Sequence, residues 1–437
     1  MADRSFTAAE LHEAWPALSM EERAEGFELL QREEAERFFT QLSAHDQAQM
    51  VLLLPPGERR IWLRLLPPDE AVDLIQEAPL EERENLLQLF DDTTRAEVRG
   101  LLVYAEDDAG GLMNPRYARL RPDMSVDEAI SYLRRDARTR GESAYYAYVV
   151  DAENRLRGVV SFRDLFVSSG EKRIETVMRK DVVTASEDMD QEALSQLFAR
   201  HNLIMIPVVD SERRIKGVVT LDDIIDVVQE EATEDIQKIG GTAALEAPYL
   251  EVPLLQMIGK RAGWLTVLFI GEMLTATAMG HFEAEIARAV VLALFVPLII
   301  SSGGNSGSQA STLVIRAMAL GEVRLRDWWL VVRRELATGF VLGSILAGIG
   351  LIRILVWQSA FQIYGEHYVL VGVTVAVSLL GVVLWGTLAG STLPLVLRMI
   401  GLDPASASAP FVATLVDVTG ILIYFSVANV MLRGTLL

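Results

Sequence analysis

The segment from Pro410 to Leu432, PFVATLVDVTGILIYFSVANVML, carries the residue with the clearest chemical potential, Asp417. The segment is long enough to cross a bilayer, which takes about 20 mostly apolar residues, and Asp417 is its one charged residue. A carboxylate at membrane depth costs about 2.5–3.5 kcal/mol on insertion scales, so it usually faces a water-filled path or a partner. Thr414 and Gly420 share its helix face. We interpret Asp417 as a cation-binding acid that lines a path through the membrane.

Two structural roles are alternatives to ion binding. Asp417 could cap a helix break near Thr419 and Gly420, or it could pair inside the bundle with Arg316, at the end of another apolar segment. Glu272, in the first apolar segment, is a second acid at membrane depth, and it is either a site residue or a buried partner.

A run of small polar residues follows Pro297 in the second apolar segment. It reads SSGGNSGSQ over residues 301–309 and continues through Ser311 and Thr312. Such a run at membrane depth either lines water or lets helices pack closely. Its amide side chains favour a hydrated path. We predict that the path is lined by Gly304, Asn305, Ser308, Thr312, Ala413, Thr414 and Asp417.

The available donor atoms indicate which ion such a path would take. The chain has no cysteine, and its five histidines are scattered. Carboxylate, hydroxyl and carbonyl oxygens favour a hard cation over zinc or copper. Mg²⁺ dehydrates reluctantly and usually binds through few carboxylates, keeping several waters. One Asp per subunit, doubled across a two-fold axis, would hold hydrated Mg²⁺ with an affinity modest enough for release.

Five apolar segments must position these residues, at roughly 262–280, 289–318, 336–358, 368–397 and 409–432. Lys and Arg gather before the first segment, between the second and third, and between the fourth and fifth. This distribution predicts a cytoplasmic N-terminus and an external C-terminus in a multi-pass protein of the cell membrane, surrounded by lipid. The N-terminus has no apolar core of a secretory signal.

The net charge of −20 comes from the first 253 residues, which hold 51 Asp and Glu against 29 Lys and Arg. An acidic half of this kind attracts cations and repels nucleic acid, so we expect no nucleic-acid partner. No nucleophile with an adjacent base is evident, which makes an enzyme the least favoured class.

Residues 5–105 read as short helices whose starts recur every 12 residues, at Ser43, Pro55, Pro67 and Pro79. Leucines fill the intervals, which predicts a small helical solenoid. Its acids Asp69, Asp73 and Glu77 form either a solvated face or, as the alternative, a cation-bridged surface.

Residues 148–165 (YVVDAENRLRGVVSFRDL) repeat as residues 207–224 (PVVDSERRIKGVVTLDDI). Each copy reads strand, helix, strand, turn, strand, helix, and the two copies resemble a CBS-domain pair. In CBS pairs, a Ser/Thr-x-x-Asp turn of the kind found at residues 161–164 and 220–223 often holds an adenine nucleotide. Tyr146 could stack on the base and Arg163 could reach phosphate. Alternatively, the two hydroxyls only cap their helices, and Asp223 faces another carboxylate.

An acidic helix follows, carrying Asp226, Glu230, Glu231, Glu234 and Asp235, and Gly240-Gly241 ends it. It links the acidic half to the apolar half. Its charged residues either form a plain solvated surface or belong to a helix that transmits movement from a sensor to a pore.

Taken in order, these parts resemble the MgtE family of magnesium channels over essentially the whole chain. The most specific motifs are residues 302–309 (SGGNSGSQ), 410–420 (PFVATLVDVTG) and 231–236 (EATEDI). The resemblance implies a homodimer that conducts Mg²⁺ along its interface, with Asp417 binding the ion. The chain departs from some members in carrying Ser308 and Ala409 where they carry Asn.

The resemblance also implies regulation by ligands. Cytosolic Mg²⁺ would bridge acids and close the path, and ATP would bind at Tyr146, Arg163 and Asp223. The implied regulatory acids are Asp69, Asp73, Glu192, Asp223, Asp226, Glu231, Glu234, Asp235 and, in a cytoplasmic loop, Asp403.

We therefore expect a multidomain α and α+β membrane protein. Its expected parts are a helical N-domain solenoid (1–108), a tandem CBS pair (109–228), a connecting plug helix (229–258) and a five-helix transmembrane domain (259–437). Two other functions remain open: transport of another divalent cation, such as Co²⁺ or Ca²⁺, and nucleotide sensing at the membrane without transport.

Overall fold

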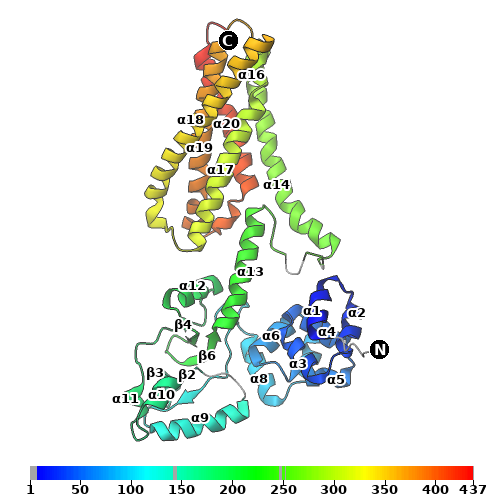
Figure 1. The fold of residues 1–437 in the computed structure, drawn as a ribbon, viewed down its shortest axis with the longest axis vertical. Coiled ribbons are helices and arrows are strands. Elements are labelled where there is room, and N and C mark those ends of the chain that lie inside the picture. Colours follow the sequence, from blue (N-terminus) through cyan, green and yellow to red (C-terminus); the bar gives the residue numbers. More distant parts are fainter. Residues whose placement is uncertain (1–6, 141–144, 246–248, 251, 437) are drawn as a thin grey trace. The chain divides into compact units, whose positions relative to one another are not determined.

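The structure is a computed structural model that describes residues 7–140, 145–245, 249–250 and 252–436 (Figure 1). It divides into two compact units, Met1–Gln229 and Glu230–Leu437, which are described separately.

The first unit begins with short helices whose apolar sides share one core. Four of them, α4 to α7, begin at residues 44, 56, 68 and 80, which confirms the predicted period. The Ser43 hydroxyl caps α4, and Pro56 and Pro68 occupy first-turn positions that need no N–H partner. The helices are α1 (Ala8–Ala14), α2 (Met20–Glu28), α3 (Arg32–Gln41), α4 (Ala44–Leu53), α5 (Pro56–Leu63), α6 (Pro68–Glu77), α7 (Leu80–Leu87) and α8 (Asp92–Leu101).

Two three-stranded sheets follow, one for each sequence repeat. In each sheet a parallel pair is followed by an antiparallel hairpin, and the hairpin turns place Asn154 and Arg213 at φ values of 62° and 61°. The predicted internal repeat is therefore confirmed. The first repeat contains β1 (Arg119–Leu120), α9 (Val126–Arg140), β2 (Tyr146–Val150), β3 (Leu156–Ser161) and α10 (Phe162–Val167). After α11 (Ile174–Val177), the second contains β4 (Ala185–Ser186), α12 (Gln191–His201), β5 (Met205–Val209), β6 (Ile215–Thr220) and α13 (Leu221–Ile239).

The core of the N-terminal helices continues into the second repeat. Leu74 and Ile75 of α6 belong to the same buried cluster as Ile224 of α13. This packing holds the first turns of α6 and α13 close together, which matters because both turns are acidic.

Helix α13 is one continuous helix and shows no break at residue 229. No Gly or Pro interrupts residues 221–239, so the last helix of the second repeat simply runs on. It ends before Gly240 and Gly241, as predicted, and Gly241 has a φ of 74°. The segment 229–258 is thus divided among the end of α13, a connection, and the start of α14.

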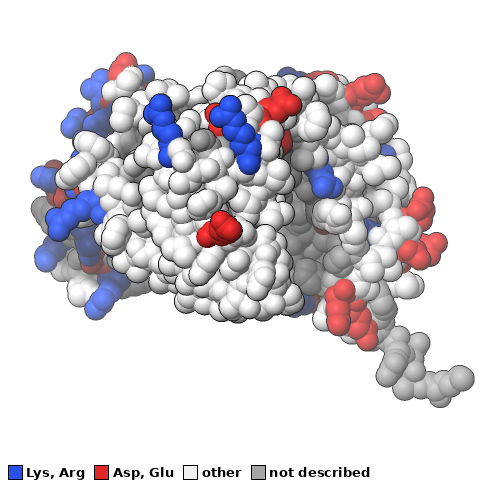
Figure 2. Space-filling view, turned by 90° about the horizontal axis from the view of Figure 1, so that it is seen from above, with Lys and Arg blue, Asp and Glu red and all other residues white. Residues whose placement is uncertain are grey.

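Five helices in the described residues are long and apolar enough to cross a membrane, which confirms the predicted number. The second span, Val290–Ala319, consists of the short helix α16 followed by α17, which begins with Pro297 in its first turn, where the missing N–H is tolerated. The other four spans contain α14 (Leu254–His281), α18 (Trp328–Phe361), α19 (Tyr368–Met399) and α20 (Ala409–Leu432). The second contains α16 (Val290–Ala293) and α17 (Val296–Ala319), and the short helix α15 (Glu283–Arg288) lies between the first two spans. Figure 2 shows a face on which uncharged residues predominate.

Glycines bring the backbones of α17 and α19 into direct contact. A Cβ atom on Gly386 would overlap the carbonyl oxygen of Gly303, and one on Gly390 would overlap that of Gly307. A Cβ on Gly307 would lie 2.9 Å from the carbonyl oxygen of Gly386. Small residues of this kind let membrane helices approach closely.

We expect Gly390→Ala to lower the thermal unfolding temperature of the full chain in detergent by several degrees. The added methyl must push α19 from α17, and overpacking costs about 1–3 kcal/mol. Gly348→Ala on α18 is the matched control, because nothing lies within 4 Å of its Cβ position. Equal unfolding temperatures for the two variants would contradict the close packing.

Candidate functional site

Asp417 lies in the middle of an unbroken helix, α20, and its side chain is half-buried. Gly304 of α17 faces it. A Cβ atom at Gly304 would lie 3.4 Å from Ala413 and 3.5 Å from Oδ1 of Asp417. The absence of a side chain at Gly304 therefore leaves room beside the carboxylate.

The structure supports neither structural alternative for Asp417. No helix break occurs near Thr419, whose hydroxyl donates to the Leu415 carbonyl and accepts from the indole of Trp385. Among the described ion pairs, none joins Arg316 to Asp417. A capped break is therefore wrong, and the Arg316 pair is not formed.

The polar run of α17 divides between two faces. Gly303, Ser306, Gly307 and Ser311 are buried, with the two glycines packed against α19 and α20. On another face of the same stretch of α17, a stripe of exposed polar residues runs along the helix: Asn305, Gln309 and Thr312. The buried face confirms close packing of small residues, whereas the polar path on the exposed face stays a prediction.

The hydroxyls near this stripe donate to backbone carbonyls. Ser308 donates to Ala409 (2.9 Å), Thr312 donates to Ser308 (2.9 Å), and Thr414 donates to Pro410 (3.1 Å). A hydroxyl that donates its proton to a backbone carbonyl still has oxygen lone pairs that can accept from water or bind a cation. Of the predicted lining residues, Gly304 of α17 lies beside Ala413 and Asp417 of α20, and Ser308 of α17 contacts the start of α20.

A second acidic site lies in the first unit, where α6 meets the start of α13. Burial, then Asp223, raises the pKa of Asp69 well above its usual range, and the same two causes raise the pKa of Glu70 to about 7. Burial raises the pKa of Asp223 to about 6, although hydrogen bonds from Thr220 oppose the shift. The amide of Asn114 donates to Asp69 (3.1 Å).

The members of this α6/α13 cluster are Asp69, Glu70, Asp73, Asp222, Asp223 and Asp226. Four of them were predicted, but sequence reasoning missed Glu70 and Asp222. Both stand next to a predicted acid, which was the only available signal. Glu192 lies on another helix, α12, where it accepts a hydrogen bond from Gln196.

A third acidic site lies in the second unit, at the end of α13. The ammonium of Lys238 lies 2.6 Å from Glu234 and 2.7 Å from Asp403 in the loop before α20. Burial, then Asp403 and Glu231, raises the pKa of Asp235 to about 6. The structure thus brings together four predicted acids, but around a lysine that the sequence analysis did not single out.

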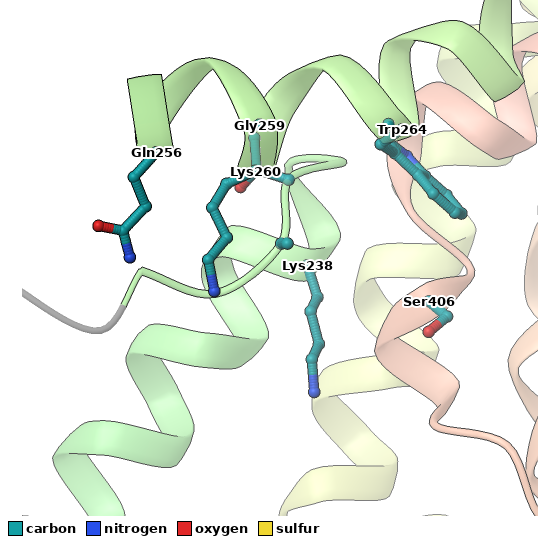
Figure 3. Close-up of a pocket in the computed structure, with 9 residues that line it drawn as sticks. Lys238, Gln256, Gly259, Lys260, Trp264 and Ser406 are labelled. Atoms are coloured by element: carbon teal, nitrogen blue, oxygen red, sulfur yellow. The ribbon is translucent and has the colours of Figure 1, made fainter. Parts of the chain in front are cut away.

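Lys238 also lines a cavity of about 570 Å³ between the end of α13 and the start of α14 (Figure 3). Gln256, Lys260 and Trp264 of α14 line its other side, with Ser406 nearby. The Trp264 indole donates to Ser408 (3.2 Å), which joins α14 to the start of α20.

No group of three or more His, Asp or Glu side chains in the described part of the chain is placed to hold a metal ion by direct ligation.

The predicted nucleotide residues lie at corresponding ends of the two repeats. Tyr146 pairs with Ser161 across β2 and β3, and Arg163 follows on an exposed turn. Ser161 caps α10, accepting from the Asp164 N–H, while Thr220 donates to Asp223. Both hydroxyls thus have the local roles expected without a nucleotide.

Comparison with known families accounts for most of the chain. Residues 296–427 match the MgtE divalent cation transporter, residues 6–107 match the MgtE intracellular N domain, and residues 107–169 and 174–230 match the CBS domain. These matches confirm the predicted fold class.

Two magnesium transporters are similar to this chain over most of its length. The chain is 41% identical to the magnesium transporter MgtE of Thermus thermophilus over 80% of its own length and 76% of the relative's. It is 33% identical to that of Enterococcus faecalis over 77% and 72%. A crystal structure of the cytosolic domain of the Mg²⁺ channel MgtE in complex with ATP covers 51% of this chain and 90% of that one, at 39% identity and a TM-score of 0.47.

The α6/α13 cluster predicts an inverse dependence of stability on pH. Because the folded-state pKa values of Glu70 and Asp223 are raised, the folded state binds more protons, and its stability falls as pH rises from about 4 to about 7. We expect the unfolding temperature of the full chain without divalent ions to be lower at about pH 8 than at about pH 5. Mg²⁺ should raise it more at the higher pH.

Glu70→Gln provides the internal control, since it removes one ionisation and should flatten the pH profile above about pH 6. A pH profile identical to that of the unmodified chain would contradict the clustering of these carboxylates.

Proposed function

Because the chain belongs to the MgtE family of divalent cation transporters, we propose that it conducts Mg²⁺ across the cell membrane and is closed by cytosolic Mg²⁺. The observation that carries the conduction proposal is the Asp417 carboxylate. It is half-buried at membrane depth and faces Gly304 of α17, which has no side chain and is followed by Asn305 of the exposed polar stripe. A hydrated divalent ion suits a carboxylate at this depth beside polar side chains.

The polar stripe also supports a homodimer. Asn305, Gln309 and Thr312 are exposed on a helix that would otherwise meet lipid, where polar side chains are unfavourable. A second copy placed along this stripe would cover it and bring two Asp417 carboxylates to one path. The basic loops support a cytoplasmic location for the acidic N-terminal half.

Closure by Mg²⁺ follows from the charge of the acidic sites. Carboxylates that face one another repel, and a bound divalent ion removes that repulsion. Asp222, Asp223 and Asp226 of the α6/α13 cluster lie on the same helix as the acids at the end of α13, so ions at both sites would favour one conformation of that helix. A ligand shifts a conformational equilibrium only by its differential affinity for the two states.

We also propose that an adenine nucleotide binds the CBS pair and modulates closure. Tyr146 lies beside the Ser161 turn and Arg163 is exposed next to it, which suits base stacking and phosphate binding. Asp223 would serve both ligands, because it belongs to the α6/α13 cluster as well. Nucleotide binding would therefore alter the affinity of that cluster for Mg²⁺.

Asp417→Asn should reduce Mg²⁺ flux into liposomes by at least about 100-fold, because the amide keeps the shape of the side chain but lacks its charge. Flux of Mg²⁺, Co²⁺ and Ca²⁺ through the unmodified chain identifies the preferred ion. Unchanged Mg²⁺ flux in Asp417→Asn would overturn the conduction site. An unmodified chain that passes none of the three ions would favour membrane-anchored nucleotide sensing.

Replacing Glu231, Glu234 and Asp235 with Gln, Gln and Asn should raise the cytosolic Mg²⁺ concentration that halves channel current in patch recordings, by about tenfold. The reason is that the closed state loses the acids whose repulsion Mg²⁺ relieves. The matched control removes three exposed acids of α2, as Glu21→Gln, Glu25→Gln and Glu28→Gln. Equal inhibition curves for the two triple variants would contradict the proposed mechanism of closure.

A further inference from the structure

Glu272 is a charged residue at membrane depth that the conduction proposal leaves without a role. It lies in the middle of α14, and its side chain is exposed on the single chain. A carboxylate turned toward lipid is strongly unfavourable, so its surroundings in the membrane must be water, a cation or protein.

Contacts along α14 fix the depth of Glu272 relative to Asp417. Trp264 lies 6.0 Å from Phe411 between ring centroids, and Phe282 stacks on Phe425 at 4.9 Å. Later residues of α14 thus meet later residues of α20, so the two helices run in the same direction.

The contact between Gly271 and α20 places the acid more closely. A Cβ on Gly271 would lie 2.9 Å from the Thr414 methyl group. Glu272 is one residue beyond Gly271, and Asp417 is three residues beyond Thr414. At about 1.5 Å of rise per residue, the two carboxylates lie within about one helical turn of the same depth.

Asp417 lies on the side of α20 between its contacts with α14 and its contacts with α17. Its neighbour Thr414 meets α14, whereas Ala413 and its own Oδ1 meet Gly304 of α17. Glu272 flanks the side of α14 that packs on α20, one position beyond the contact at Gly271. Both acids therefore border the contact between α14 and α20, on different helices.

Thr275 gives a second, independent indication of a ligand. It lies four residues after Gly271, on the same helix face toward α20, and it is 6% exposed. Its hydroxyl has no hydrogen-bond partner among the described residues. A buried hydroxyl without a partner costs about 1–3 kcal/mol, unless water or an ion's hydration shell satisfies it.

We propose that Glu272 and Thr275 extend the Asp417 site on α14 and bind the water shell of the permeating divalent cation. Glu272 supplies a second negative charge at the depth of Asp417, and the Thr275 hydroxyl oxygen accepts a hydrogen bond from a metal-bound water. A doubly charged ion gains more than a monovalent one from two carboxylates, so the pair also favours divalent over monovalent cations. This inference rests on the proposed conduction through the Asp417 site.

The test measures Mg²⁺ flux and the ratio of Mg²⁺ to Na⁺ flux with the full chain in liposomes. Glu272→Gln should raise the half-saturating Mg²⁺ concentration about tenfold and lower the Mg²⁺/Na⁺ ratio by a similar factor. Thr275→Val keeps the side-chain shape and should raise the half-saturating concentration about threefold. Glu272→Asp keeps the charge and should restore most of the selectivity.

Glu366→Gln is the matched control, because it removes an exposed acid outside the five spans. Asp417→Asn is measured in parallel. If it abolishes flux while Glu272→Gln and Thr275→Val match the control, the inference about α14 fails alone. If Asp417→Asn leaves flux unchanged, the proposed conduction site fails and the inference fails with it.

Discussion

Repulsion between carboxylates that the fold holds close together is the constraint on which the rest depends. The α6/α13 cluster gathers six acids around a buried contact between helices, and burial keeps the pKa values of Asp69, Glu70 and Asp223 raised. A fold that concentrates like charges in this way is stable only because the apolar core beneath it offsets the repulsion. Under the proposed mechanism, a cation bound among these acids would relieve the repulsion and so favour the conformation that holds them together.

At the end of α13, Lys238 already supplies one positive charge. Its ammonium contacts Glu234 and Asp403, and these hydrogen bonds, outweighing its burial, raise the pKa of Lys238. This ion pair joins the helix to the loop before α20 without any metal. Asp235 remains beside the pair with a raised pKa, so one lysine does not offset all the local negative charge. A divalent ion bound here would strengthen a connection between α13 and the loop before α20 that Lys238 already makes.

Much of the fold could be predicted because its signals are local. Pro at helix starts, the repeated strand patterns and five long apolar segments each lie within one stretch of sequence. The clusters could not be predicted from the residues alone, because they join distant residues: Glu70 to Asp222, and Lys238 to Asp403. Sequence reasoning also treated residues 301–312 as either packing or path. On a helix, the residues that pack against neighbours and the residues that stay exposed lie on different faces. Which residue lies on which face becomes evident only when the surroundings of Gly304 and Asn305 are known.

The continuity of α13 explains how acids far apart in sequence can act together. Its 19 residues span about 28 Å, with Asp222, Asp223 and Asp226 near one end and Glu234 and Asp235 near the other. Gly and Pro are absent between them, so the helix resists bending at the point where the second repeat ends. Under the proposed mechanism, cations at either end stabilise one placement of the same rigid element. Because both groups of acids bias one conformational equilibrium, their effects on it combine, and contact between the two groups is not required.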